Sequence, residues 1–450
     1  MDISTEPRLL AGEILSRVEK HNAYANIAFD AVAHRGGISR DVKALAKELI
    51  FGVLRNQSRL ERAVSAYIKY PLSHTQPFVR RQLIIAAYQL LFLDSIPDYA
   101  VVDKAVEIIR VSMGTSPSGF ANAVLRKIVN EGEPSFPSFE NSPREFISQF
   151  YSYPDWIVDI FIKSVGIENA SSLAESLNSR ARTIIRTNII KNSRNELSEM
   201  ISRDFPDLEK SFTKYSPYGI EVRNMGDPIR QKLHREGNYL IQDEGSQLVS
   251  LFVDPQKGEK ILDACAGTGG KSLHMAALTG NESEILAVDS KASKMDALRQ
   301  RAVRTGCTRI RTTPMDLTLG YPDELFDRIL LDSPCSGLGV LRRHPEAKWR
   351  LKREDINDLV VTQQKLLENV SSLVKPGGTL IYTVCTFNNE ETTDQIEKFL
   401  LNHKNFELAP KPENSIVNWD GITTNEGYLR LYTHLHDCDG FFGARLIRKS

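Results

Sequence analysis

The sequence of 450 residues has few cysteines, no excess of charge of one sign and no long hydrophobic run. Lys and Arg number 57 and Asp and Glu also number 57, so the net charge excludes indiscriminate binding to polyanions. The five cysteines form no C-x-x-C pair, which argues against structural zinc and a disulfide framework and predicts reduced thiols. We therefore expect no metal. Hydrophobic residues at 41% are enough for a buried core, which excludes a disordered, collagenous or coiled-coil chain.

Neither a membrane span nor an export signal is indicated. The most apolar run, residues 82–93, is interrupted by Tyr88 and Gln89 and is shorter than the roughly 18 residues that cross a bilayer. It predicts a core helix. The first eight residues carry acids where a secretory signal would carry bases, and no apolar segment follows them. We expect a cytoplasmic protein with no membrane partner.

The apolar pattern divides the chain into three segments. Over residues 1–132 apolar residues recur at helical spacing, for example at Leu9, Leu10, Ile14 and Val18, which predicts an all-helical domain. A stretch rich in Gly, Pro and Ser ends it. Residues 143–235 form a mixed α/β connecting segment whose residue types do not indicate a function. Residues 236–450 alternate short apolar strands with amphipathic helices, which predicts βαβ units and a parallel sheet.

Charge is distributed unevenly over these segments. Residues 1–130 carry 17 Lys and Arg against 12 Asp and Glu, and the remaining residues carry 40 against 45. A surplus this small is a weak signal that solvated helix faces also explain.

Strands in the last segment are expected at residues 261–264, 285–289, 310–313, 328–332, 379–384 and 441–447. Ligands of such sheets bind at the carboxyl ends of the strands. The first of these ends is followed by a glycine-rich turn that opens a helix, and the turn contains Cys265, Ala266, Gly267, Thr268, Gly269, Gly270 and Lys271. A turn of this kind allows a ligand to approach the backbone closely.

Three ligand classes compete for the glycine-rich turn. A phosphate-binding P-loop requires glycine where Cys265 stands, and a dinucleotide fingerprint requires glycine where Ser272 stands. An adenosyl cofactor requires neither. Asp289 ends the second strand, where an acid accepts hydrogen bonds from ribose hydroxyls, and Asp316 follows the third strand, where it is placed for an adenine amino group. A single Asp would more often cap a helix, but two such acids beside a glycine turn favour the cofactor.

Two cysteines follow the next strand ends. Asp332 ends the fourth strand with Cys335 just after it, and Cys385 follows the fifth. A single free cysteine is usually a small buried hydrophobe, but two at one mouth of a sheet indicate chemistry. Carbon C5 of a pyrimidine becomes nucleophilic when a thiolate adds at C6, and a second thiol can help to remove the C5 proton. Asp332 would hydrogen-bond the N3 and N4 edge of an unstacked base.

The segment of residues 341–350 combines five possible cations with Trp349. It offers phosphate contacts and base stacking beside the expected pocket, although a simple surface loop is about equally compatible with these residues.

At these residues the sequence resembles the RNA cytosine-C5 methyltransferases, and among them the bacterial RsmB type, which modifies small-subunit ribosomal RNA. Residues 102–106 and 120–127 resemble the NusB domain that precedes the methyltransferase in that type. The resemblance implies a multidomain fold: an all-α NusB-like RNA-binding domain, a mixed α/β segment and a Rossmann-like class I methyltransferase domain. One departure is that the family usually has Ala-Pro where this chain has Gly267 and Thr268.

The resemblance also implies roles for the residues above. The turn from Cys265 to Lys271, with Asp289, Asp316 and Asp332, would bind S-adenosylmethionine; Cys385 would be the nucleophile and Cys335 would assist product release, with Lys271 reaching the base. DNA cytosine and amino-group methyltransferases are disfavoured, because residues 368–370, which read Glu-Asn-Val, lie in a predicted helix and residues 332–335 lack a Pro-Pro pair. We expect a monomer acting on small-subunit rRNA, with a tRNA methyltransferase and a non-catalytic RNA-binding assembly factor as alternatives.

Overall fold

The computed structural model describes residues 2, 4–33, 37–413 and 416–450. Met1 and Ile3, part of the stretch in which no export signal is expected, lie outside the described residues. The chain forms two compact units: unit 1 comprises Met1–Ser179 and Leu341–Leu351, and unit 2 comprises Arg180–Val340 and Lys352–Ser450. Among the described residues no helix is long and apolar enough to cross a membrane.

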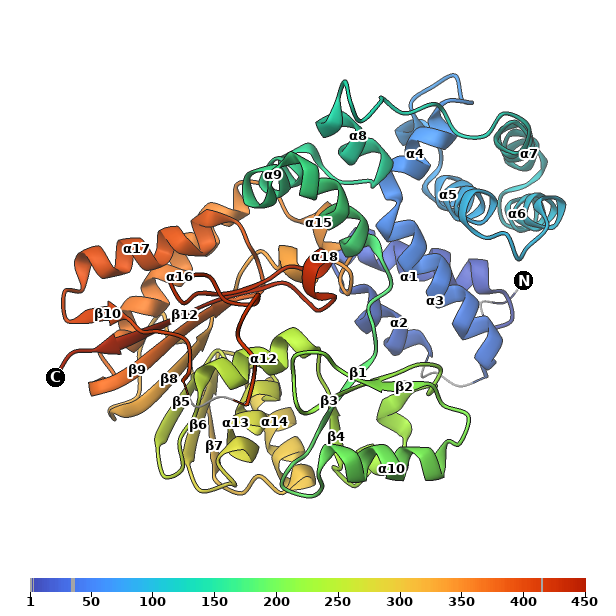
Figure 1. Ribbon diagram of the computed structural model, residues 1–450. Helices are drawn as coiled ribbons and strands as arrows, with labels where there is room; N and C mark the ends of the chain where they lie inside the picture. Colours follow the sequence, from blue (N-terminus) through green and yellow to red (C-terminus); the bar gives the residue numbers. More distant parts are fainter. Residues whose placement is uncertain (1, 3, 34–36, 414–415) are drawn as a thin grey trace. The chain divides into compact units, whose positions relative to one another are not determined.

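Unit 1 is helical, as its apolar spacing predicts. Ile14 and Val18 of the first helix and Ile50 of the third are buried in one core, and α5, α6 and α7 pack against one another (Figure 1). Ser39 caps the third helix by accepting a hydrogen bond from the backbone N–H of Val42. The elements of unit 1 are α1 (Pro7–His21), α2 (Ala25–Ala33), α3 (Arg40–Arg55), α4 (Gln57–Ser65), η1 (Leu72–His74), α5 (Pro77–Phe92), α6 (Asp98–Met113), α7 (Thr115–Glu131), α8 (Pro143–Phe150), α9 (Asp155–Asn178) and α15 (Ala347–Arg350).

Unit 2 opens with a small antiparallel sheet of order β2-β3-β1-β4, with α10 packed against β3. A capping box, in which Ser193 and Glu196 bond each other's backbone N–H groups, starts α10. These elements are β1 (Ile184–Thr187), α10 (Arg194–Asp204), β2 (Lys210–Phe212), β3 (Gly219–Val222), η2 (Pro228–Arg230), α11 (Lys232–Arg235) and β4 (Tyr239–Ile241). The predicted middle segment thus contributes α8 and α9 to unit 1 and strands β1, β2 and β3 of this sheet to unit 2, whereas β4 lies beyond it; its bounds stay a prediction.

The large sheet of unit 2 has the order β10-β12-β9-β8-β5-β6-β7, with β11 paired to β12. All six predicted strands are present in it. Its elements are α12 (Glu244–Val253), β5 (Lys260–Ala264), α13 (Gly270–Leu278), β6 (Glu284–Asp289), α14 (Ala292–Thr305), β7 (Ile310–Pro314), β8 (Phe326–Asp332), η3 (Leu338–Val340), α16 (Asp355–Ser371), β9 (Val374–Val384), η4 (Asn389–Glu391), α17 (Thr393–Asn402), β10 (Phe406–Leu408), β11 (Leu429–Leu431), α18 (Thr433–His436) and β12 (Phe441–Arg448).

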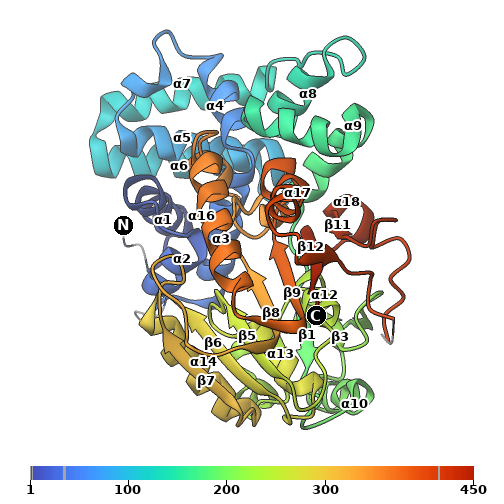
Figure 2. The ribbon, with the colours of Figure 1, turned by 90° about the vertical axis from the view of Figure 1, so that its left-hand side faces the viewer.

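Strand alternation gives this sheet two apolar faces. Ile261 and Ala287 pack against residues of α12, α13 and α14, whereas Leu262 and Leu286 pack with residues of α16 and α17. Figure 2 shows α16 in front of the sheet, where it contacts β8 and β9. The sheet is therefore covered by helices on both faces, as βαβ units require.

The predicted parallel sheet is observed, but its last strands are antiparallel. Strands β9, β8, β5, β6 and β7 are parallel, but β12 runs antiparallel to β9. Phe442, near the start of β12, pairs with Val384 at the end of β9. The chain therefore enters β12 at the carboxyl ends of the parallel strands and needs no crossover helix.

Candidate functional site

Two loops that follow neighbouring parallel strands bring the predicted thiols together. Asp332 at the end of β8 pairs with Thr383 in β9, and the Thr383 hydroxyl donates a hydrogen bond of 3.1 Å to Asp332 Oδ1. Just beyond these strand ends, the Sγ atoms of Cys335 and Cys385 lie 3.4 Å apart. Cys335 and Cys385, which are 50 positions apart in the sequence, thus lie together at the carboxyl ends of the strands.

The surroundings of Cys335 disfavour loss of its proton. Cys335 has a pKa well above its ordinary value, because its sulfur shares a hydrogen bond with Cys385 and because it is buried. The charges of Cys385 and Glu391 raise its pKa further. The Cys335 thiol is therefore held in its protonated form within the pair.

Lys271, in the first turn of α13, completes this group. Its Nζ lies 2.6 Å from Asp332 Oδ2 and 5.3 Å from the centre of the Phe441 ring. Burial alone would lower the pKa of Lys271, but the adjacent Asp332 carboxylate outweighs it and raises that pKa. The ammonium is therefore charged and mostly shielded from water, beside the two thiols.

The glycine-rich turn has the backbone geometry that its sequence predicts. Cys265, Gly267 and Gly269 have φ angles of 67°, 58° and 84°. A Cβ atom on Gly269 would lie 2.4 Å from Cγ of Leu298, so that position requires glycine. The Gly267 N–H donates a 3.1 Å hydrogen bond to Asp289 Oδ2, which ties the turn to the end of β6.

The departure at Gly267 and Thr268 is accompanied by a contact from α14. Arg301 Nη1 donates a 2.9 Å hydrogen bond to the Thr268 hydroxyl. A side-chain contact thus restrains the turn at the position where the family usually has proline, whose ring restrains the backbone directly.

The two acids predicted to face the cofactor have different surroundings. Asp289 is buried, and it accepts hydrogen bonds from the Lys291 N–H at 3.0 Å and from Lys294 Nζ at 2.9 Å. Asp316 is exposed, and its Oδ1 accepts from the N–H and hydroxyl of Thr318, which stabilises the turn after β7. The structure places Asp289 against the glycine turn and Asp316 on the surface beyond β7.

Comparison with known proteins identifies the family. Residues 5–130 match the NusB family model, and residues 250–447 match the model of the 16S rRNA methyltransferase RsmB/F. Over 448 residues the chain is 32% identical to the probable ribosomal RNA small subunit methyltransferase B of Bacillus subtilis (strain 168), with 99% of both proteins covered. This chain belongs to the RsmB/F family of 16S rRNA methyltransferases.

Two further comparisons extend over almost the full length. The chain is 32% identical to the probable ribosomal RNA small subunit methyltransferase B of Synechocystis sp. over 445 residues, covering 98% of each. The crystal structure of PH0851 superposes with a TM-score of 0.78 at 26% identity, covering 98% of each chain. The predicted fold class is confirmed: a helical NusB-like domain, and a Rossmann-like methyltransferase domain that depends on S-adenosylmethionine as members of this family do.

The residues around the glycine turn fit that cofactor, which carries a sulfonium and an ammonium. Burial and the charges of Asp332, Asp289 and Asp263 raise the pKa of Cys265 to about 12, so three carboxylates surround the turn. Asp263 is fully buried, and its Oδ1 has no hydrogen-bond partner among the described residues. An acidic cradle with an unsatisfied oxygen suits a cationic ligand.

Three residues of unit 2 that support the site were not predicted from the sequence. Arg186 of β1 is buried and donates a 2.8 Å hydrogen bond to the Gly270 carbonyl, so the small sheet supports the glycine turn. The Ser272 hydroxyl donates to Asp263, and Glu391 receives donors from the Cys335 loop. Arg186 follows two isoleucines in β1, and a charged residue beside such an apolar pair is a usable signal. Glu391 follows three other polar residues, and nothing in the sequence distinguishes it from them.

Residues 341–350 do not form an exposed loop of unit 2, and their expected contact with RNA stays a prediction. This segment belongs to unit 1, and Arg342 and Lys348 are each 1% exposed. Lys348 Nζ donates to the Arg55 carbonyl at 2.7 Å, and Trp349 Nε1 donates to the Leu54 carbonyl at 2.7 Å. The ammonium of Lys348 and the indole N–H of Trp349 thus bind backbone carbonyls near the end of α3.

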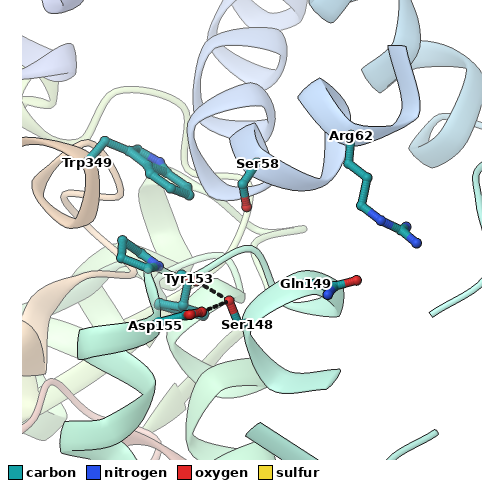
Figure 3. Close-up of a pocket in the computed structure, with 8 residues that line it drawn as sticks. Ser58, Arg62, Ser148, Gln149, Tyr153, Asp155 and Trp349 are labelled. Atoms are coloured by element: carbon teal, nitrogen blue, oxygen red, sulfur yellow. Dashed lines mark hydrogen bonds between the residues drawn. The ribbon is translucent and has the colours of Figure 1, made fainter. Parts of the chain in front are cut away.

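A pocket of about 410 Å³ lies in unit 1 beside this segment (Figure 3). Trp349, Arg62 and Gln149 are among its lining residues, and the Ser148 hydroxyl beside them donates to Asp155. None of the predicted site residues lines this pocket. Across the described part of the chain, no group of three His, Cys, Asp or Glu side chains is placed to hold a metal ion.

Proposed function

We propose that the chain methylates C5 of a cytidine in small-subunit 16S rRNA through a covalent bond between Cys385 and C6. The observation that carries this proposal is the pair of sulfur atoms 3.4 Å apart, next to the ion pair of Lys271 and Asp332. A methyltransferase acting on nitrogen or oxygen needs no thiol, whereas methylation at C5 needs a nucleophile and a base. The names of the curated relatives support small-subunit rRNA as the substrate.

Addition to the ring comes first. The Cys385 sulfur, as thiolate, forms a bond to C6, and the π electrons of the C5=C6 bond shift toward C5. Asp332 accepts a hydrogen bond from the N4 amino group and so orients the base, while Lys271 balances the charge of that carboxylate. S-adenosylmethionine, when bound, would supply the electrophilic methyl group for C5. We assign its binding to residues 265–271 with Asp289, Asp316 and Asp332.

Release requires the second thiol. Once Cys385 is bonded to C6 it is a neutral thioether, so the main cause of the raised pKa of Cys335 is removed. Cys335 then loses its proton to solvent, and the thiolate takes the proton from C5. The C5–H electrons re-form the C5=C6 double bond, and the C6–S bond breaks with its electrons on Cys385.

The two cysteines give opposite results in one experiment. Full-length Cys335→Ala and Cys385→Ala variants are incubated with S-adenosylmethionine and small-subunit rRNA from a strain deleted for the gene. Cys335→Ala is expected to accumulate an RNA–protein adduct that survives denaturing electrophoresis, because elimination is blocked after methyl transfer. Cys385→Ala is expected to form none.

The outcome also decides between functions. Adduct in Cys385→Ala and none in Cys335→Ala would reverse the roles of the two thiols. Cofactor binding without methyl incorporation into rRNA would favour a non-catalytic assembly factor, and incorporation only into tRNA would change the substrate. Bisulfite sequencing of rRNA from the deletion strain is expected to show one cytidine that has lost its methyl group.

A further inference from the structure

Glu391 at the end of η4 is a buried carboxylate that no step above uses. Its exposed fraction is 0%. Oε1 accepts hydrogen bonds from the Ser336 N–H at 2.8 Å and from Gln363 Nε2 at 2.9 Å. Oε2 accepts from the Ser336 hydroxyl and from Asn388 Nδ2, each at 2.5 Å. Burying a carboxylate is costly, and here four neutral donors offset that cost.

The hydrogen bonds of this group involve the residues on both sides of Cys335. Ser336 follows Cys335 and gives Glu391 both its backbone N–H and its hydroxyl. Pro334 precedes Cys335, and its carbonyl accepts a 2.9 Å hydrogen bond from the same Gln363 Nε2 that binds Glu391. The backbone on each side of the thiol is therefore held by one connected group.

The same group reaches the loop of the other thiol. Thr386, next to Cys385, has its hydroxyl 2.9 Å from the Ser336 hydroxyl, and it accepts a 3.2 Å hydrogen bond from Asn388 Nδ2. The Cys385 carbonyl also accepts from the Gly339 N–H at 2.9 Å. Glu391 is thus the common acceptor of a network that joins the two cysteine loops at the residue beyond each cysteine.

We propose that Glu391 is a positioning residue for the thiol pair, which holds the Cys335 loop against the Cys385 loop so that Cys335 can remove the C5 proton. The assignment of this proton transfer rests on the function proposed above. Glutamine has nearly the same shape but one acceptor oxygen and one amide that donates. Because all four partners donate, Glu391→Gln loses acceptors for two of them and loosens the loop without opening a cavity.

The first test measures the thiol pair without RNA. Dibromobimane becomes strongly fluorescent when it bridges two thiols, and monobromobimane labels each thiol singly. We expect Glu391→Gln to bridge Cys335 and Cys385 about tenfold more slowly than wild type, by loss of alignment. Single labelling of Cys385, located by mass spectrometry, should stay within about twofold, because that thiol remains equally accessible. Equal bridging rates in variant and wild type would overturn the proposal.

The second test measures release of the adduct in single turnovers. We expect Glu391→Gln to form the Cys385 adduct at close to the wild-type rate and to release it about 10- to 100-fold more slowly. In a Cys335→Ala background, Glu391→Gln should slow release no further, because Glu391 acts through Cys335. A further loss in that background would mean a general structural role and would overturn the proposal.

Two variants serve as controls. Glu390→Gln alters the neighbouring glutamate, whose Oε1 lies 2.7 Å from Arg353 Nη2, and it should behave as wild type in both tests. If Glu391→Gln does not fold, Ser336→Ala takes its place, because it keeps the backbone N–H donor and removes the hydroxyl that links Glu391 to Thr386. Ser336→Ala is then expected to slow bridging and release, and wild-type rates would overturn the proposal.

Failure of this proposal differs from failure of the proposed function. If wild type makes no 5-methylcytosine, the proposed function fails, and bimane bridging still tests the positioning of the thiols. If wild type makes 5-methylcytosine and Glu391→Gln matches it in bridging and release, the inference about Glu391 alone fails.

Discussion

Lys271 in unit 2 and Lys348 in unit 1 are both shielded from water, yet their surroundings differ. Lys271 lies 2.6 Å from the Asp332 carboxylate, and its pKa is raised. Lys348 donates to the Arg55 carbonyl and to Asn178 Oδ1 at 3.1 Å, with its Nζ 3.9 Å from the centre of the Tyr153 ring. Burial lowers its pKa well below the ordinary value, and the charge of Arg55 lowers it further.

The difference separates a lysine suited to chemistry from a lysine used in packing. A carboxylate beside Lys271 keeps the ammonium charged next to the two thiols, where charge develops on a bound base. The contacts of Lys348 satisfy its N–H groups within unit 1 but offer no carboxylate, so its charged form is the disfavoured one. Residue type and burial alone do not distinguish the two; the nearest acceptor does.

The largest expected effect follows removal of the charge of Lys271. We expect Lys271→Met to lower kcat for rRNA methylation by about 10²-fold or more, because an uncompensated Asp332 carboxylate disfavours negative charge on the ring. Methyl transfer from radiolabelled S-adenosylmethionine measures kcat, and thermal unfolding checks that the variant folds.

Lys294→Met is the matched control in the same unit. Lys294 Nζ also lies 2.9 Å from an aspartate, Asp289, but its side chain is 39% exposed. A partly exposed ion pair is worth at most about 1 kcal/mol, so the KM for S-adenosylmethionine should change by less than about fivefold and kcat should be preserved. Equal losses of kcat in both variants would show that Lys271 has no special part in the reaction.

The sequence predicts this site better than it predicts Lys348. The predicted carboxyl ends of four strands, at Ala264, Asp289, Asp332 and Val384, coincide with the observed ends of β5, β6, β8 and β9. Local alternation and the turns that follow determine these ends, and parallel pairing then brings the loops beyond them together. The family resemblance supplied which thiol attacks the base, a choice that the residue pattern left open.

What the sequence misses depends on contacts between distant residues. Lys348 and Trp349 donate hydrogen bonds to the carbonyls of Arg55 and Leu54, almost 300 positions away. The same holds for Glu391, whose role depends on its distance from Ser336, 55 positions earlier. A run of cations with a tryptophan is compatible both with an exposed loop and with a packed segment, and only long-range contacts decide between them.

A second prediction concerns the pH dependence of stability. The pKa of Lys348 is lowered in the folded protein from its ordinary value of 10.5, so between the two values the unfolded chain binds more protons. The free energy of unfolding should therefore rise with pH across that window, and Lys348→Met should abolish the rise. Below pH 10.5, the free energy of unfolding of wild type should increase relative to that of Lys348→Met as the pH rises, by up to about 1.4 kcal/mol per pH unit, as measured by urea unfolding.

Lys127→Met is the control for this measurement. Lys127 in α7 is exposed, and its substitution should leave the shape of the pH dependence unchanged. A constant difference between wild type and Lys348→Met at every pH would mean that Lys348 titrates as an ordinary lysine, and the contrast with Lys271 would then disappear.

The smallest expected effect is on the salt dependence of RNA binding. Each cation that contacts a phosphate adds roughly 0.7 to 0.9 to the slope of log K against log salt concentration. Lys348 is 1% exposed, so Lys348→Met should leave that slope unchanged, whereas Lys127→Ala, on an exposed helix face, should reduce it by up to about one. Filter binding of small-subunit rRNA between about 50 and 200 mM salt measures both slopes.

If Lys348→Met lowered the slope as much as Lys127→Ala, residues 341–351 would have to leave their place in unit 1 when RNA binds. Lys348 would then be a phosphate ligand that is stored in the free protein rather than a packing residue.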